Sequence, residues 1–370
     1  MTTAHDSNDI RIFYKQCISL ALAGYEVFLV AMGESYVLNG VNVVGLQYSG
    51  SGRLYRMTRG SKAIYRKALE TEADVYQIHD PELLPYALKL KAKGKRVIFD
   101  SHEYYYKQIL EKKYMPLILR YLVAYIYFLY ETYACKRIDA VITPCSVNGL
   151  SMFEKRSRLS VFVDNTPLLD ELYNKYDDEQ TKKSRMICYT GVLSSERGIT
   201  MLIKASCRAN ANLTLAGAFA PVEYFEEVKS LTEYSCVNFK GFVDRDAIYE
   251  ILRESSVGIC TIHNVGQYNQ SDNLPTKVYE YMSMGLPVVL SNGVFARYVN
   301  RKYNCFILVD PDNLEEIASA ISFLLDNPRI AKEMGMNGRL AIKNMYNWGN
   351  EEKKLLKLYE YVCSKKSKKE

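Results

Sequence analysis

The sequence predicts an α/β protein built from two doubly wound domains, and three observations support this fold class. The chain has 370 residues, which is more than one core usually contains. Short apolar runs alternate with helical patterns, as in the βα repeat of a parallel sheet. The alternation starts again in the second half, with no short internal repeat. We expect a first domain over residues 1–166, a second over 167–345, and a final helix with a basic tail over 346–370.

The composition is that of a globular protein without bound nucleic acid. Hydrophobic residues make up 48% and charged residues 24% of the chain, and nine scattered cysteines form no CxxC pair. Buried, reduced thiols in a cytoplasmic protein are therefore expected. The net charge of +6 is concentrated in the tail and in residues 107–137, which favours an anionic membrane surface or phosphorylated substrates as partners. No apolar run reaches about eighteen residues, so we expect at most peripheral membrane contact.

The first segment is expected to be a helix, capped by Asn8 or Asp9 and ended by Gly24, before a strand over residues 26–31. Its predicted apolar face contains Phe13, Cys17, Leu20 and Ala21. Only Met1–Thr3 is available for a preceding first strand of the sheet. Whether these three residues suffice is left open by the sequence.

The four histidines follow predicted strands. His79 and His102 end the runs DVYQIH and KRVIFDSH, His5 lies near the start, and His263 follows SVGICTI in the second half. Ligands of doubly wound sheets gather at the carboxyl ends of strands, so these side chains are candidates for a shared cleft. No HxxxH or carboxylate spacing indicates a metal site.

Residues 104–137 mix aromatic and basic side chains. Pro116 predicts two helices, the second over residues 117–136. This helix is apolar nearly all round, so it either contacts a bilayer interface or lies in the core, and both interpretations stay open. A strand at DAVITP, a helix over residues 145–155 and an exit near Asn165 complete the first domain.

The second half repeats strand and helix several times. The expected strands are RMICYTG, ANLTLAG, CVNFKGFV, SVGICTI, residues 287–290 and CFILVD. The expected helices cover residues 199–209, 221–230, 244–253, 276–284, 314–325, 330–345 and 351–362.

Residues 271–291, SDNLPTKVYEYMSMGLPVVLS, join a polar loop, a short helix ended by Gly285, and a buried strand. Asp272, Lys277 and Glu280 lie at the start and along this helix. Backbone amides and a lysine attract phosphate, and a carboxylate accepts hydrogen bonds from two ribose hydroxyls. This pattern is typical of a nucleotide-sugar site.

The same stretch resembles the acidic-x7-acidic motif of glycosyltransferase family 4, retaining enzymes of the GT-B fold that act in bacterial surface polysaccharide synthesis. Two positions depart from the family pattern. The first acid is Asp272 where relatives usually carry Glu, and Val192 stands where many carry Arg. The resemblance implies a GT-B fold, with two Rossmann-like domains facing across a cleft and a last helix that crosses back to the first domain.

The resemblance also implies roles for individual residues. His102, Asp272 and Arg197 are the catalytic candidates, with His102 directed at the donor sugar. The donor-binding candidates are Gly191, Arg197, Gly241, Phe242, Val243, Asn273, Leu274, Lys277 and Glu280, with Glu280 on the ribose and residues 241–243 on the base. His5, Asp9 and His79 are candidates on the acceptor side. No metal ion or other cofactor is expected.

The expected function is transfer of a hexosyl group, with retention, from a nucleotide sugar to a lipid-linked or growing polysaccharide acceptor of a capsule, O-antigen or exopolysaccharide. UDP-sugars are favoured as donors and GDP-sugars stay open. The enzyme would work in the cytoplasm, with peripheral contact to the inner face of the plasma membrane. Two alternatives remain: a nucleotide-sugar epimerase of the same fold, and a non-catalytic nucleotide-sugar-binding partner subunit.

Overall fold

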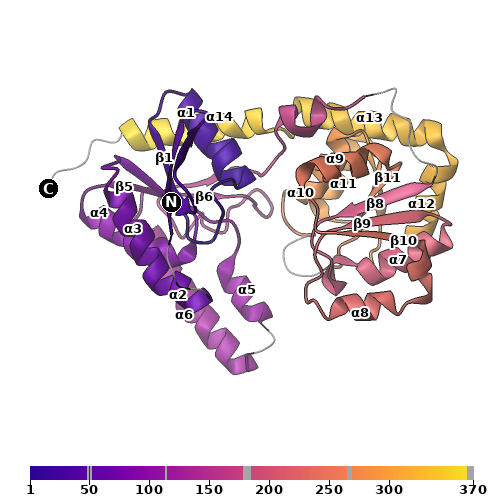
Figure 1. The fold of residues 1–370 in the computed structure, drawn as a ribbon, viewed down its shortest axis with the longest axis horizontal. Coiled ribbons are helices and arrows are strands. Elements are labelled where there is room, and N and C mark those ends of the chain that lie inside the picture. Colours follow the sequence, from indigo (N-terminus) through magenta and orange to yellow (C-terminus); the bar gives the residue numbers. More distant parts are fainter. Residues whose placement is uncertain (48–49, 51, 113–114, 178–184, 265–268, 365–370) are drawn as a thin grey trace. The chain divides into compact units, whose positions relative to one another are not determined.

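The computed structural model describes residues 1–47, 50, 52–112, 115–177, 185–264 and 269–364. Contacts divide the chain into two units, residues 1–165 with 349–370 and residues 166–348 (Figure 1). Each unit contains parallel strands with helices packed on them, which confirms the predicted fold class.

The second unit holds one parallel sheet of six strands. Its strands are β8 (Met186–Thr190), β9 (Asn212–Ala216), β10 (Val237–Gly241), β11 (Val257–Cys260), β12 (Val288–Ser291) and β13 (Phe306–Val309). Their order is β10-β9-β8-β11-β12-β13, so the order reverses between β8 and β11. Every residue of β11 and β12 is buried, which explains their continuous apolar sequences. The reversal is the point where such sheets bind ligands at the carboxyl ends of their strands.

Seven helices of the second unit lie among the described residues; the first five connect these strands and the last two follow β13. They are α7 (Ile199–Arg208), α8 (Tyr224–Lys229), α9 (Arg245–Glu254), α10 (Thr276–Ser283), α11 (Val294–Tyr303), α12 (Leu314–Asp326) and α13 (Pro328–Asn344). Six were predicted from apolar periodicity, with boundaries shifted by a few residues. The sequence analysis missed α11, whose buried positions are only Ala296 and Val299.

The first unit has two groups of strands. One group has the order β1-β3-β2 and the other β4-β5-β6-β7. The strands are β1 (Val27–Met32), β2 (Tyr36–Leu38), β3 (Val41–Leu46), β4 (Val75–Ile78), β5 (Arg96–Asp100), β6 (Ala140–Thr143) and β7 (Ser160–Phe162).

Met1 and Thr2 join these two groups. The Thr2 N–H donates to the Val30 carbonyl of β1, and the Met1 carbonyl accepts from the His79 N–H just after β4. The Met1 amino group also donates to the Gln77 carbonyl at 2.7 Å. These residues therefore take the place of the expected first strand, although they form too few ladder bonds to count as one.

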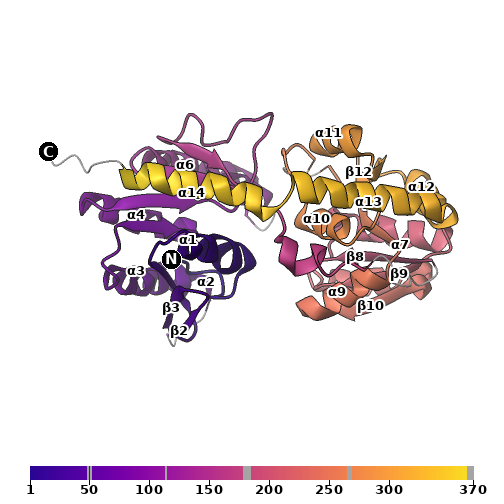
Figure 2. The ribbon, with the colours of Figure 1, turned by 90° about the horizontal axis from the view of Figure 1, so that it is seen from above.

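The helices of the first unit follow the predicted pattern in most places. They are α1 (Ile18–Leu22), α2 (Arg53–Tyr55), α3 (Ser61–Leu69), α4 (Leu84–Ala92), α5 (Tyr105–Glu111), α6 (Leu117–Cys135) and, from Gly349 onward, α14 (Trp348–Ser364). A π-helical segment over Ile10–Cys17 precedes α1, and the Asp9 carboxylate caps it by accepting from the Ile12 N–H. Figure 2 shows α14 lying along the first unit. The last helix thus belongs with the first unit, as expected.

The predicted helix over residues 145–155 is wrong. This segment forms turns and an isolated bridge, in which the Val147 and Leu150 backbones hydrogen bond to each other in both directions. Asn148 and Gly149 between them have φ values of 53° and 74°. An Asn-Gly pair favours a tight turn with two left-handed residues, and this local preference outweighs the weak helical pattern.

The nine cysteines are all free thiols, and six of them are buried, as expected for a chain without disulfides.

Candidate functional site

In the second unit, the loops that follow β8, β9 and β10 are joined by backbone hydrogen bonds. The Gly191 N–H donates to the Ala216 carbonyl at 2.8 Å, and the Gly217 N–H donates to the Gly241 carbonyl at 2.7 Å. A Cβ on Gly217 would lie 1.8 Å from the Gly191 carbonyl oxygen, so only glycine allows these two loops to approach. The predicted glycines 191 and 241 are therefore brought to one edge of the sheet.

Lys277 extends from the first turn of α10 toward Gly191. A Cβ built on Gly191 would lie 2.9 Å from the Lys277 Nζ. The Lys277 side chain is 6% exposed, and its Nζ has no hydrogen-bond partner among the described residues. Burial lowers the pKa of Lys277 to about 7, and the nearby Arg197 guanidinium acts in the same direction. A buried ammonium without a hydrogen-bond partner is costly, and an anion bound beside Gly191 would supply the missing partner.

Arg197 and the start of α7 lie next to this position. Gly198 has φ 74°, and a Cβ there would lie 2.2 Å from the Thr261 carbonyl oxygen. Glycine at this position therefore lets the loop carrying Arg197 turn into α7 close to the end of β11. Val192, where the family resemblance led us to expect a cation, is 43% exposed.

Glu280 lies on α10 and is already paired. Its Oε1 accepts from the Arg245 Nη1 at 2.7 Å, and the other terminal nitrogen of Arg245 binds Glu171. Arg245 begins α9, two residues after the predicted base-binding segment Gly241–Val243, in which Phe242 is 88% exposed. Any ribose contact of Glu280 therefore shares the carboxylate with Arg245.

The remaining predicted donor residues lie just before α10. Asp272 and Asn273 are half-buried in the loop, and Leu274 is buried in the core. Leu274 therefore packs as a core residue, with only its backbone near the loop surface.

In the first unit, three of the four histidines lie together. The rings of His5 and His102 are 4.5 Å apart, and those of His79 and His102 are 5.4 Å apart, measured between centroids. His5 faces Asp9 at 3.4 Å and Asp80 at 3.7 Å. The fourth, His263, lies in the second unit and pairs with Asp312 at 2.5 Å.

Two carboxylates that contact this histidine cluster, Asp9 and Asp100, are ionised. Burial alone would raise the pKa of Asp9, but hydrogen bonds from His5 and the Ile12 N–H lower it to about 2. Asp100 is fully buried, which also opposes its ionisation, and Arg11 with the two neighbouring histidines holds its pKa well below the usual range. Both groups therefore stay anionic at neutral pH.

A cavity of about 1040 Å³ opens beside the cluster, within the first unit. His5, His102 and Asn165 are among its polar lining residues. The lining also includes apolar side chains and charged side chains of both signs: Met57, Ile109, Met115, Val123, Arg53, Arg56, Lys112, Glu82 and Glu103. The cavity can therefore accept a molecule with both polar and apolar parts.

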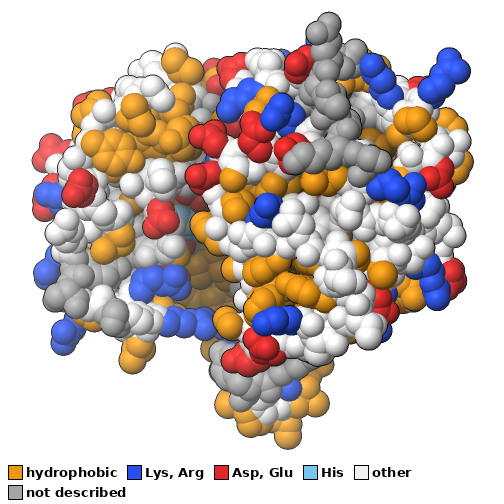
Figure 3. Space-filling model, turned by 45° about the vertical axis from the view of Figure 1, so that its right-hand side comes forward, with side chains coloured by type: hydrophobic (Ala, Val, Ile, Leu, Met, Phe, Trp, Pro, Cys, Tyr) orange, Lys and Arg blue, Asp and Glu red, His pale blue; other side chains and the backbone are white. Residues whose placement is uncertain are grey.

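Helix α6 beside this cavity carries large exposed apolar side chains. Ile118 is 84% exposed, and Tyr121 and Tyr125 are each 61% exposed. Figure 3 shows hydrophobic side chains gathered at the projecting tip of α5 and α6. Tyr104, by contrast, is buried and donates to the Cys145 carbonyl at 3.0 Å. The sequence left open whether this helix is exposed or lies in the core, and its first half is exposed. Among the described helices, none is both long and apolar enough to span a bilayer.

Several residues around the cluster were missed by the sequence analysis. Gln77, Asp80 and Asp100 face the histidines, and Arg11 and Gln16 hydrogen bond to Asp100. Asp100 ends β5 two residues before His102, so its position after an apolar strand was a usable signal. Arg11 and Gln16 gave no such signal, because their burial depends on tertiary packing.

Two family models match the chain. The model for "Glycosyl transferases group 1" matches residues 174–341, and the model for "Glycosyltransferase Family 4" matches residues 11–147. Together they cover most of both units.

Relatives and solved structures agree with these matches. The MMP alpha-(1->4)-mannosyltransferase of Mycolicibacterium hassiacum is 30% identical over 87 residues, which are 23% of this chain and 21% of that protein. The matched stretches span less than half the length of the curated relatives.

Among solved structures, the sucrose-phosphate synthase of Thermosynechococcus elongatus has a TM-score of 0.75 at 16% identity, covering 98% of this chain and 95% of its own. The Anabaena protein HepE, solved with UDP and glucose, has a TM-score of 0.69 at 14% identity, covering 93% and 94%. These likenesses show the GT-B fold.

Proposed function

We propose that this chain, which belongs to glycosyltransferase family 4, transfers a hexosyl group from a nucleotide sugar to a lipid-linked saccharide with retention of configuration. The observation that carries the proposal is the unpaired, buried Lys277 ammonium beside Gly191. A nucleoside diphosphate supplies the negative charge that this position lacks.

The second unit provides the donor contacts in this proposal. Lys277 and Arg197 neutralise the diphosphate, and backbone N–H groups around Gly191 donate hydrogen bonds to it. The Glu280 carboxylate oxygen that Arg245 does not bind accepts a hydrogen bond from a ribose hydroxyl. UDP is the favoured nucleotide, since HepE, a structural neighbour of this chain, was solved with UDP. Phe242 and Val243 would contact the base, by stacking or through their backbone groups.

The transfer step needs no metal ion in this account. The bond between the anomeric carbon and the diphosphate oxygen breaks as the acceptor hydroxyl oxygen bonds to the same carbon from the same face. The acceptor proton passes to the leaving diphosphate oxygen. The cations at residues 197 and 277 stabilise the charge that develops on the diphosphate, and His102 and Asp272 contact the sugar.

The first unit provides the acceptor site in this proposal. The acceptor saccharide would bind in the cavity beside His5, with Asp9 and His79 in the same histidine cluster, and the cations of the lining would suit a phosphate. The exposed face of α6 suits a lipid surface, since apolar and tyrosine side chains stand there beside basic residues. Lys113 and Tyr114, which belong to the same predicted surface, lie outside the described residues. We place this reaction at the inner face of the plasma membrane, in surface polysaccharide synthesis.

Calorimetry of the purified chain with UDP, GDP and a panel of nucleotide sugars tests the donor site. Binding of one nucleoside diphosphate that is at least tenfold weaker in Lys277→Met supports the proposal. Absence of binding to every member of the panel would instead favour a non-catalytic partner subunit. Incubating the bound donor alone separates the epimerase, which needs no acceptor.

A further inference from the structure

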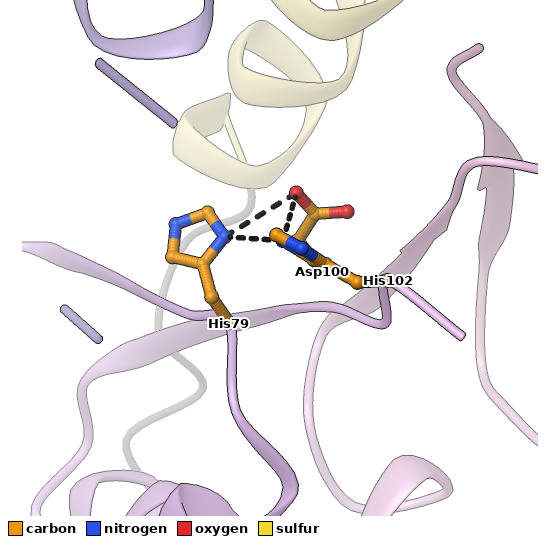
Figure 4. A group of neighbouring side chains, drawn as sticks. All are labelled: His79, Asp100 and His102. Carbon is orange, nitrogen blue, oxygen red and sulfur yellow. Dashed lines mark hydrogen bonds and ion pairs between the residues drawn. The ribbon is translucent and has the colours of Figure 1, made fainter. Parts of the chain in front are cut away.

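Three side chains of the first unit converge on one point. The His102 Nε2 lies 3.2 Å from the His79 Nδ1 and 3.5 Å from the Asp100 Oδ2 (Figure 4). The His79 Nδ1 lies 3.3 Å from the same carboxylate oxygen. Such a triangle fits either a bound metal ion or a shared proton. The surrounding hydrogen bonds distinguish the two.

The chain of hydrogen bonds starts at Asp100. Arg11 donates two hydrogen bonds to its carboxylate, from Nε at 3.2 Å and from Nη2 at 2.9 Å. The Gln16 amide faces the Asp100 Oδ2 at 2.7 Å. Because an ionised carboxylate only accepts hydrogen bonds, the Gln16 group that faces it must be the NH₂. The Gln16 Oε1 then points away from Asp100.

The orientation of Gln16 fixes that of Gln77. The Gln77 Nε2 donates to the Gln16 Oε1, and the Gln77 Oε1 accepts from the Tyr359 hydroxyl at 2.9 Å. A flipped Gln77 would bring two amide oxygens together. The Gln77 NH₂ therefore also faces the His79 Nε2, at 3.3 Å.

The Gln77 orientation determines the tautomer of His79. A ring nitrogen that faces an NH₂ group must accept, so the His79 Nε2 is unprotonated and its proton is on Nδ1. Burial lowers the pKa of His79 to about 4, although Asp100 acts to raise it, so the ring is neutral at physiological pH. The Nδ1 proton points at Asp100 and at the His102 Nε2.

We infer that the Arg11–Asp100–Gln16–Gln77–His79 network forces His102 into the tautomer with its proton on Nδ1. A proton on the His102 Nε2 would lie against the proton of His79, because the two ring nitrogens are 3.2 Å apart, closer than the 3.5 Å from the same Nε2 to the Asp100 Oδ2. The His102 Nδ1 has no hydrogen-bond partner among the described residues, and the His102 ring lines the cavity. His102 therefore offers a ligand an N–H donor.

This network also excludes a divalent cation at the triangle. The His79 Nδ1 has no free lone pair, and the Asp100 carboxylate is already occupied by Arg11 and Gln16. If the proposed function holds, on which this part rests, His102 donates to a sugar oxygen. Gln77, His79 and Asp100 are then positioning residues, and Tyr359 extends the network to the final helix.

Long-range ¹⁵N NMR of the full chain labelled at histidine tests the inference directly. Only four histidines contribute signals, and single His→Asn variants assign them. Protonated and unprotonated ring nitrogens resonate in separate regions. We expect protonated Nδ1 and unprotonated Nε2 for both His79 and His102 at pH 7.5. Any other tautomer for either ring overturns the inference, whether or not the chain is a transferase.

An isosteric substitution supplies the second test. Gln77→Glu removes the NH₂ group, so the His79 Nε2 should become the donor and the His102 proton should move to Nε2. Gln47→Glu, at an exposed position of the same unit, is the matched control and should leave both rings unchanged. Unchanged tautomers in a folded Gln77→Glu protein would remove Gln77 from the network.

A titration of the labelled wild-type chain with Zn²⁺ completes the design. We expect no stoichiometric shift of the His79 Nδ1 or His102 Nε2 signals with one equivalent of the ion. Metal-induced shifts of both would show a metal site and contradict the proton assignment.

Discussion

The ammonium nitrogen of Lys277 lies 3.7 Å from the centroid of the Tyr189 ring, and no described residue donates or accepts a hydrogen bond there. The electron-rich ring face partly offsets the burial of a cation, which is otherwise expensive. This pair links the folded core of the second unit to its proposed diphosphate site. The cation–π contact stabilises the Lys277 ammonium when no anion is bound.

Lys277→Met should stabilise the fold and weaken the nucleotide site. Removing a buried charge without a partner should raise the free energy of unfolding by about 1–3 kcal/mol at pH 7. The dissociation constant for the nucleoside diphosphate should rise at least tenfold. Denaturant unfolding and calorimetry measure the two effects. Lys240→Met, at an exposed lysine of the same unit, should change neither quantity, and a destabilised Lys277→Met protein would contradict the burial argument.

The lowered pKa of Lys277 gives two pH effects of known sign. In the folded chain the group titrates at about 7, against 10.5 for an ordinary lysine. The unfolded chain therefore binds more protons between these values, and the unfolding free energy should rise with pH across this window. Lys277→Met should lack that rise.

Nucleotide binding should also take up a proton. A bound diphosphate favours the charged form of Lys277, which is mostly neutral at pH 8 in the free protein. Calorimetry at pH 8 in buffers of different ionisation enthalpy should show close to one proton taken up with UDP. Uptake that persists in Lys277→Met would assign the proton to another group.

Glu280→Ala should weaken nucleotide binding by about 1.5–3 kcal/mol through loss of hydrogen bonds to the charged carboxylate. The matched control is Glu171→Ala, because Glu171 is the other carboxylate bound to Arg245. If Glu280 contacts the ribose, only its substitution should weaken UDP more than 2′-deoxy-UDP. Equal losses in both variants would mean that the carboxylates act only by holding Arg245.

The exposed face of α6 predicts binding to anionic vesicles. Ile118→Gln with Leu122→Gln should reduce binding, and so should charge reversal of Lys107, Lys112 and Lys113. Ile118 and Leu122 are 84% and 53% exposed, so their substitution should change the unfolding free energy by less than about 0.5 kcal/mol. Cosedimentation at low and high salt is the measurement. Vesicle binding that does not change with salt or with either set of substitutions would show that α6 is not the membrane contact. Nucleotide affinity, the control, should be the same in all variants.

The sequence predicted the architecture well because its signals are local. Apolar runs and helical periodicity gave the strands and most helices of the second unit, and Pro116 separated α5 from α6. The prediction failed over residues 145–155, where the Asn148-Gly149 turn outweighed a weak helical pattern.

The candidate site was predictable only in part. The family resemblance indicated Gly191 and Gly241, and the position of Lys277 on its predicted helix indicated that residue. The burial of Lys277 and the pairing of Glu280 with Arg245 depend on contacts between distant segments. The network around Asp100 joins residues from four distant segments of the chain, up to Tyr359. No local sequence pattern predicts such a network.

The most direct test of the proposed transferase is NMR of ¹³C-labelled UDP-hexoses incubated with the full chain and vesicles containing lipid-linked saccharides. The account predicts that an α-linked donor disappears only when acceptor is present, with release of UDP and a new α-glycoside signal. A β-glycoside, or conversion of the donor into a second nucleotide sugar without acceptor, would contradict it.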